Sequence, residues 1–190
     1  QLYGAIEGIA RDRVHVMEHG ASLAFGGGKF MFLETPGHAR HHLSVIEQAT
    51  RSAFTGDAFG LCYRWLQRGK KPFVMASTPP TDFDPALARA SVDAILEAGP
   101  KRIYVTHFGV IENVAAAAEV LLRSIDDMES ILNDAVSGDL LDAALLTYCQ
   151  DRVRASFQAL ADWCGFELEA ADCAGIEKDV LINGQGIAHR

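Results

Sequence analysis

The sequence has few of the features that direct a chain to a membrane, to nucleic acid or to an oxidising compartment. No apolar run approaches the ~20 residues that cross a bilayer. The 17 Lys and Arg residues are scattered among 25 Asp and Glu residues, and the net charge of −8 argues against a general binder of phosphate backbones. The four cysteines form no CxxC pair, so we expect buried, reduced thiols and a cytoplasmic protein.

Low-complexity tracts and internal repeats are also missing. With 190 residues, 49% of them hydrophobic, the chain is long enough for one large domain or for a small domain with an appendage. It begins with Gln1 and shows no signal peptide, and we expect that the natural N-terminus lies upstream.

The first third of the chain has the alternation and the turn residues of short strands. A glycine run at 26–28 is typical of a hairpin turn. The predicted strands cover residues 13–17, 23–25, 30–33, 44–47 and 52–55.

A helix and a further strand follow in the middle of the chain. Asp84 is a suitable N-cap with Pro85 at the first helical position, and Gly99-Pro100 ends the apolar stripe. Ile103-Tyr104-Val105 is then a short buried strand. This order of strand, helix and strand predicts an α/β layer.

Beyond residue 112 the pattern is helical almost throughout. We predict one helix over 114–133, broken at Ser137-Gly138, a second over 139–163, and a shorter one after Asp179. An apolar stripe on the first of these helices indicates packing in the core or a homodimer contact: Leu121, Leu122, Ile125, Met128, Ile131 and Leu132. The predicted organisation is thus an α/β part, 1–111, and a helical C-terminal subdomain, 112–190.

Three side chains suited to metal binding each follow a predicted strand and stand beside a glycine. They are His38, Asp57 and His107. A strand end is a rigid support, and the glycine lets the backbone turn sharply enough to direct the ligand. Imidazole and carboxylate are ligands for zinc, iron or manganese, and a carboxylate with two free oxygens can bridge two metal ions.

The segments 33–38, 54–57 and 105–107, which read LETPGH, FTGD and VTH, resemble the third, fourth and fifth metal motifs of the metallo-β-lactamase superfamily. The resemblance covers roughly 13–109. It implies the C-terminal half of a four-layer αββα sandwich with the metals at one edge of its sheets. It also assigns His38 to one metal, Asp57 to the bridge and His107 to the other metal, and the helical appendage to shaping the substrate pocket.

One motif of that family is missing. Its His-x-His-x-Asp-His motif supplies up to four ligands upstream of the third motif, and the 37 residues before His38 do not contain it. His15 and His19 have the wrong spacing, and the pattern favours a strand residue and a turn residue. We therefore expect a truncated chain that is inactive alone, and no catalytic side chain is identified in it because the family's nucleophile is a metal-bound hydroxide.

Several residues near these motifs have two open interpretations. His41 and His42 either orient a ligand or contact substrate, a role for which His42 is favoured, or face solvent. Tyr63 and Trp65 either contact substrate or pack in the core, and the loop 78–84 reads as an ordinary turn that could also line the pocket mouth.

The predicted function is metal-dependent hydrolysis of a small-molecule ester, lactone, thioester or phosphoester by the complete protein, with two zinc ions, although iron or manganese would also suit the ligands. A second hypothesis is a metal-free interaction or scaffold domain. A third is an iron-dependent oxidoreductase of the same fold, as in sulfur dioxygenases or flavodiiron proteins.

Overall fold

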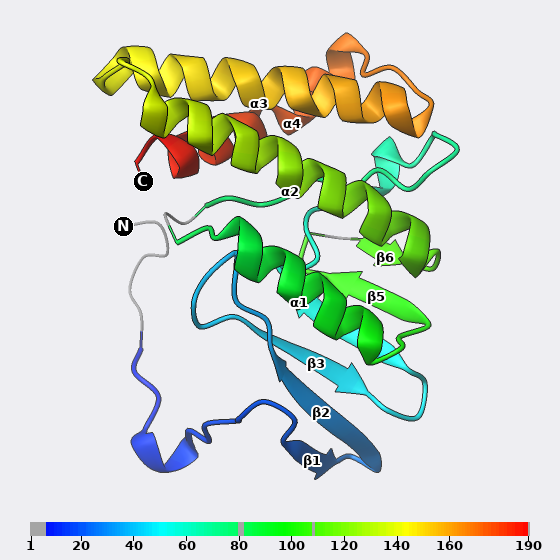
Figure 1. The fold of residues 1–190 in the computed structure, drawn as a ribbon. Helices are drawn as coiled ribbons and strands as arrows, with labels where there is room; N and C mark the ends of the chain where they lie inside the picture. The colour runs from blue at the N-terminus through cyan, green and yellow to red at the C-terminus, as the bar shows by residue number, and fades with distance from the viewer. Residues whose placement is uncertain (1–6, 80–81, 108, 190) are drawn as a thin grey trace.

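The computed structural model describes residues 7–79, 82–107 and 109–189. Over these residues the chain forms one mixed sheet and four α-helices (Figure 1). The strands are β1 (Ser22–Phe25), β2 (Gly28–Glu34), β3 (Leu43–Glu47), β4 (Ser52–Gly56), β5 (Arg102–Val105) and β6 (Gly109–Ile111). The helices are α1 (Pro85–Glu97), α2 (Val114–Ser137), α3 (Asp142–Cys164) and α4 (Ala170–Ala188), with short 3-10 turns at Arg11–Arg13 and Arg64–Leu66.

The six strands lie in the order in which they occur in the sequence. All neighbours are antiparallel except β4 and β5, which are parallel and are connected through α1. A parallel pair needs such a crossover, and a helix commonly supplies it. The predicted α/β class is therefore confirmed.

The two faces of the sheet differ in burial. One face packs under the helices, and its buried side chains join a continuous core with residues of α1, α2, α3 and α4: Leu33, Ile46, Ala53, Ile103 and Ile111. The other face carries a row of apolar side chains paired from strand to strand: Phe32, Val45, Phe54, Tyr104 and Val110. Within this row Phe54 and Val110 are 46% and 52% exposed.

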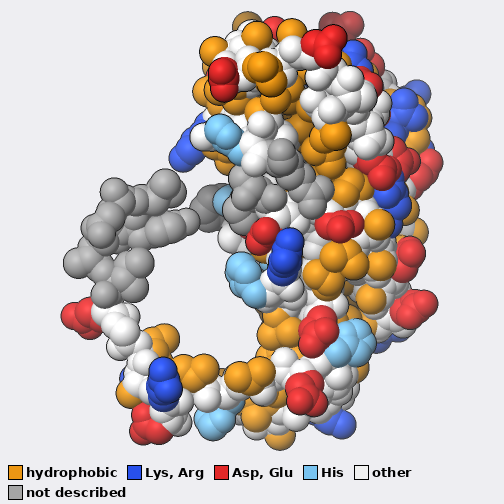
Figure 2. All heavy atoms as spheres, turned by 60° about the vertical axis from the view of Figure 1, so that its left-hand side comes forward, with side chains coloured by type: hydrophobic (Ala, Val, Ile, Leu, Met, Phe, Trp, Pro, Cys, Tyr) orange, Lys and Arg blue, Asp and Glu red, His pale blue; other side chains and the backbone are white. Residues whose placement is uncertain are grey.

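The N-terminal segment departs from the sequence prediction. A strand over 13–17 was predicted, but residues 14–18 form no regular structure. Residues 7–16 are exposed and stand clear of the body of the molecule (Figure 2). Val14 and Val16 alternate like strand residues, yet in the described part of the chain no neighbouring strand pairs with their backbone. His15 is accordingly not a strand residue, whereas His19 does lie in a turn.

The helical region differs from the prediction mainly at its end. The break at Ser137-Gly138 is confirmed, although α2 continues four residues beyond the predicted Asn133. The last helix is a correction: α4 begins at Ala170, ahead of the predicted start after Asp179. Its three glycines mask it in the sequence, because Gly has a low helix propensity. In the fold these glycines allow close contacts with Trp65, Gln150 and Thr78.

Three of the four cysteines are buried as predicted. All four are free, and Cys62, Cys149 and Cys164 are buried, whereas Cys173 is only half-buried. Burial raises the pKa of the Cys62 and Cys164 thiols to about 11, so both stay protonated at neutral pH. None of the helices in the described ranges combines the length and the apolar character needed to span a membrane.

Candidate metal centre

The three predicted ligands meet because their strands run in the same direction. β2 and β4 are each antiparallel to β3, and β4 is parallel to β5. The carboxyl ends of β2, β4 and β5 therefore lie at the same edge of the sheet. His38 follows β2, Asp57 follows β4 and His107 follows β5, so the fold brings all three to that edge.

Glycines make the turns into the site possible. Gly56 has a φ of +52°, and a Cβ added there would lie 2.7 Å from the His42 ring. Gly37 has a φ of +129°, and a Cβ there would meet the backbone of Ala88 in α1 at 2.4 Å. Both positions require a left-handed backbone and close contact, which only Gly provides without strain.

The Asp57 carboxylate lies between the two histidines. Its Oδ2 is 3.6 Å from Nε2 of His38, and its Oδ1 is 3.2 Å from Nε2 of His107. The approach of His107 lacks hydrogen-bond geometry, and Oδ1 is a buried atom without a hydrogen-bond partner among the described residues. A buried carboxylate oxygen without a partner is costly, so this atom is suited to a ligand that the protein itself does not supply.

These positions fit metal ions between the carboxylate and each imidazole. Bonds of about 2.0–2.2 Å from zinc to nitrogen and oxygen place two ligand atoms roughly 3–3.5 Å apart. The two observed separations are close to that range, with one histidine for each carboxylate oxygen. Among the described residues no group of three or more His, Cys, Asp or Glu side chains could hold a metal ion. Each metal position therefore has two ligands, one imidazole and one carboxylate oxygen, and a complete metal site needs more.

The ring of His38 is oriented by a backbone carbonyl. Its Nδ1 lies 3.1 Å from the carbonyl oxygen of Ser77. Because a carbonyl only accepts hydrogen bonds, Nδ1 carries the proton and donates it. In the neutral imidazole this leaves the lone pair of Nε2 free on the side of Asp57.

His42 contacts the backbone of Asp57. The backbone N–H of Asp57 donates to Nε2 of His42 at 3.2 Å, and Nδ1 of His42 lies 3.2 Å from Oγ1 of Thr35. Burial, and then the neighbouring His38, lower the pKa of His42, which keeps the ring neutral and able to accept. His42 thus contacts the turn that carries Asp57. His41, in contrast, is exposed.

The aromatic residues after Asp57 contact the C-terminal helix. The Tyr63 hydroxyl donates to Oδ1 of Asp179 in α4 at 3.2 Å, and the Tyr63 ring stacks on Trp65. Burial, and then the charge of Asp179, raise the pKa of Tyr63 to about 12. Burial also raises the pKa of Asp179, although the hydrogen bond from Tyr63 lowers it.

Sequence reasoning did not find Ser77, Asp179 or Asn183. Ser77 acts through its backbone, which has no side-chain signature. Asp179 and Asn183 lie in a helix whose start was misplaced, and their burial becomes visible only in the fold. In the loop 78–84, Asp84 caps α1 by accepting from the Leu87 N–H, and Thr78 is buried; Pro80 and Thr81 lie outside the described residues.

Known proteins share both the sequence pattern and the fold. The model of the metallo-beta-lactamase superfamily matches residues 2–107. The metallo-beta-lactamase fold-containing protein ST1585 of Sulfurisphaera tokodaii is 31% identical over 111 residues, which are 58% of this chain and 39% of that protein.

The archaeal superfamily protein ST1585 from Sulfolobus tokodaii has a crystal structure that covers 99% of this chain, with a TM-score of 0.55 and 21% identity. The family protein TTHA1429 from Thermus thermophilus covers 76% of the chain and 44% of its own length, with 22% identity and a TM-score of 0.48.

The chain is shorter than these relatives. It spans 39% of the curated ST1585 sequence and 57% of the solved ST1585 chain. The family match nevertheless covers more than half of the chain and includes His38, Asp57 and His107. On this match, supported by the shared fold, the chain belongs to the metallo-beta-lactamase superfamily.

Proposed function

We propose that the complete protein is a metal-dependent hydrolase whose dinuclear centre uses His38, the bridging carboxylate of Asp57, and His107. The observation that carries the proposal is the Asp57 carboxylate, which presents one oxygen to each of two imidazole Nε2 atoms. The remaining ligands come from a segment outside these 190 residues, in keeping with the greater length of the relatives.

The residues of the chain have separate tasks in this proposal. Ser77 holds His38 with Nε2 free, and His42 fixes the backbone of Asp57 while accepting its N–H. A bound divalent cation lowers the pKa of water from about 15.7 to about 7 and polarises a carbonyl or phosphoryl oxygen. Substrates with an ester, lactone, thioester or phosphoester bond suit that chemistry, and zinc is the metal we propose.

Metal content tests the assignment. Inductively coupled plasma mass spectrometry is applied to this chain and to a polypeptide extended through the upstream coding region. We expect two zinc ions in the extended polypeptide and few or none in the short one. In the extended polypeptide, H38A and H107A should each lower the zinc content. H41A is the matched control, because His41 is exposed in the same segment, and it should retain both ions.

Other outcomes point to different functions. Two metals retained in a variant that lacks His38, Asp57 and His107 together would refute the site. Iron in place of zinc, with thiol-dependent oxygen uptake, would favour an oxidoreductase. No metal in either polypeptide would favour a metal-free interaction domain.

A further inference from the structure

The C-terminal helix α4 turns a buried polar face toward the loops that carry the candidate metal centre. Asp172, Asp179 and Asn183 are all buried, and their spacing of seven and four residues puts them on one side of the helix. Each bonds to the segment between β4 and α1. The partners are Arg68, Tyr63 and Thr78, respectively.

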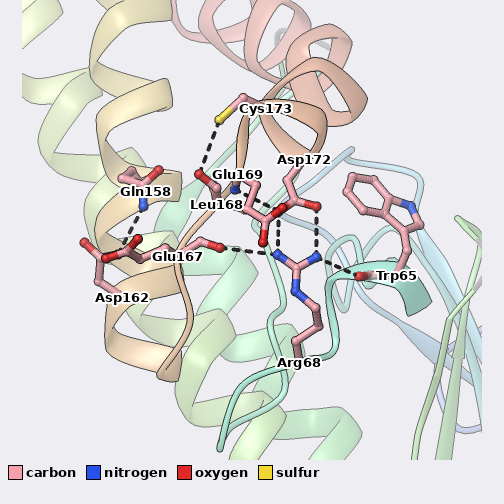
Figure 3. Close-up of polar contacts among 9 residues, drawn as sticks. All are labelled: Trp65, Arg68, Gln158, Asp162, Glu167, Leu168, Glu169, Asp172 and Cys173. Carbon is pink, nitrogen blue, oxygen red and sulfur yellow. Dashed lines mark hydrogen bonds and ion pairs between the residues drawn. The ribbon is translucent and has the colours of Figure 1, made fainter.

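The first of these contacts anchors the start of the helix (Figure 3). The Arg68 guanidinium donates to both carboxylate oxygens of Asp172, while Asp172 also accepts from the backbone N–H of Glu169. Arg68 donates further to the carbonyls of Trp65 and Glu167. The guanidinium holds the pKa of Asp172 below its ordinary value, so the pair stays charged at neutral pH.

Asn183 makes several hydrogen bonds with Thr78. Its side chain is fully buried, and Oδ1 accepts from the Thr78 backbone N–H at 2.7 Å. The Thr78 hydroxyl lies 2.9 Å from the same Oδ1 and 2.8 Å from the Asn183 carbonyl oxygen. The Nδ2 group donates to the Asp179 carbonyl at 2.8 Å. One turn further on, Gly186 lets the helix approach the Thr78 carbonyl.

The segment that Asn183 holds is the one that orients His38. Thr78 directly follows Ser77, whose carbonyl accepts from Nδ1 of His38. On the other side of Ser77, the Ala76 N–H donates to the Ser124 hydroxyl of α2 at 2.9 Å. The Ser77 carbonyl is therefore fixed between two helices, and neither belongs to the part of the chain that matches the family model.

We propose that Asn183 is a positioning residue for His38. It acts through Thr78 and the Ser77 carbonyl, which keeps the His38 proton on Nδ1 and Nε2 free for a metal ion. The role of Nε2 rests on the proposed function, whereas the tautomer does not. Without the Asn183 side chain, Thr78 loses the hydrogen bonds that its backbone N–H and its hydroxyl make to Oδ1. The Ser77 carbonyl, which accepts from the His38 ring, is then held less firmly.

The test is made on the full-length protein with three variants. N183A removes the anchor. T78S keeps the hydroxyl and the N–H, so every hydrogen bond to Asn183 is retained. V180A is the matched control, since Val180 is 1% exposed on the same helix but lines the groove between α3 and α4. V180A weakens the packing of α4 and removes none of the hydrogen bonds between Asn183 and Thr78.

Two measurements are made on each variant. The first is a ¹H–¹⁵N correlation spectrum of the histidine side chains in metal-free protein, which reports the His38 tautomer. The second is the Kd for Zn²⁺, measured by competition with a chelator. For N183A we expect a mixture of His38 tautomers and about a tenfold weaker Kd, the lower end of the loss seen when outer partners of metal ligands are removed.

T78S and V180A should keep the single tautomer and the Kd of the unmodified protein. A folded N183A variant that keeps the Nδ1–H tautomer and its zinc affinity would overturn the proposal, as would a V180A variant with the same loss as N183A. If H38A does not change zinc binding, the proposed metal centre is wrong. In that case the tautomer of His38 in the N183A variant still decides the role of Asn183.

Discussion

The position of Asp57 depends on a short series of side-chain contacts behind it. The Ser44 and Thr35 hydroxyls are 2.9 Å apart, and Thr35 contacts His42, which accepts from the Asp57 N–H. Since Nε2 of His42 accepts, its Nδ1 donates to the Thr35 hydroxyl, which also shares a hydrogen bond with the Ser44 hydroxyl. These hydrogen bonds connect the turn that carries Asp57 to the buried ends of β2 and β3.

A substitution at Gly56 would disturb this arrangement directly, because Gly56 lies against the His42 ring. In G56A the new Cβ would lie 2.7 Å from the His42 ring, in addition to the strain of a left-handed backbone. We expect an unfolding free energy lower by about 2–4 kcal/mol, measured by urea denaturation. G26A is the matched control, because Gly26 has a similar φ of +58° with nothing within 4 Å, and it should lose only about 1 kcal/mol. Equal losses in the two variants would show that the contact with His42 is unimportant.

The sequence predicts the three candidate ligands more readily than the residues that orient them. His38, Asp57 and His107 each carry a distinctive side chain beside a glycine at a strand end, so a local pattern suffices. Ser77 acts through a carbonyl, and Asn183 lies 105 residues from its partner Thr78. No local pattern encodes a pairing of that separation, and only the packed fold brings these residues together.

At the level of elements, most segments with a partner inside the chain were predictable, although the short strand β6 was not predicted. Strands β1 to β5 and helix α1 fall close to their predicted bounds, since apolar alternation, turn glycines and the Asp84 cap all agree. Two segments were predicted wrongly because tertiary context overrides the local pattern. Residues 13–17 alternate like a strand without a pairing strand, and α4 contains glycines that its close contacts require.

Helix α4 allows the ion pairs of two arginines, Arg68 and Arg154, to be compared. Arg68 bonds to Asp172, whose side chain is 8% exposed, whereas Arg154 bonds to Asp151 and Glu177, which are largely exposed. Removing Arg68 leaves a carboxylate in the protein without its partner, while exposed pairs contribute little. We expect R68A to lower the thermal midpoint by roughly three times as much as R154A, measured by circular dichroism. Equal decreases of the thermal midpoint in R68A and R154A would mean that the Arg68 contacts do not anchor the helix.

At the scale of the whole molecule, the described residues cover the sheet on one face only. The row from Phe32 to Val110 extends over five strands, and an apolar strip of this kind is rarely left to solvent in a soluble protein. A four-layer sandwich places a second sheet against it, and sheets in such sandwiches pack about 10 Å apart. The relatives are long enough to supply that layer.

The open face of the sheet can be tested for protection by a second layer. We expect Phe54 and Tyr104, which stack on each other, to be oxidised several-fold more slowly in the extended polypeptide than in this chain, by hydroxyl-radical footprinting with mass spectrometry. Leu141, 75% exposed at the start of α3, is the internal control and should react equally in both. In this chain, F54S should weaken binding of the dye ANS, and L141S should not. Equal oxidation of Phe54 in the two polypeptides would place the second layer elsewhere, and the missing metal ligands would then have to reach His38 and His107 from another direction.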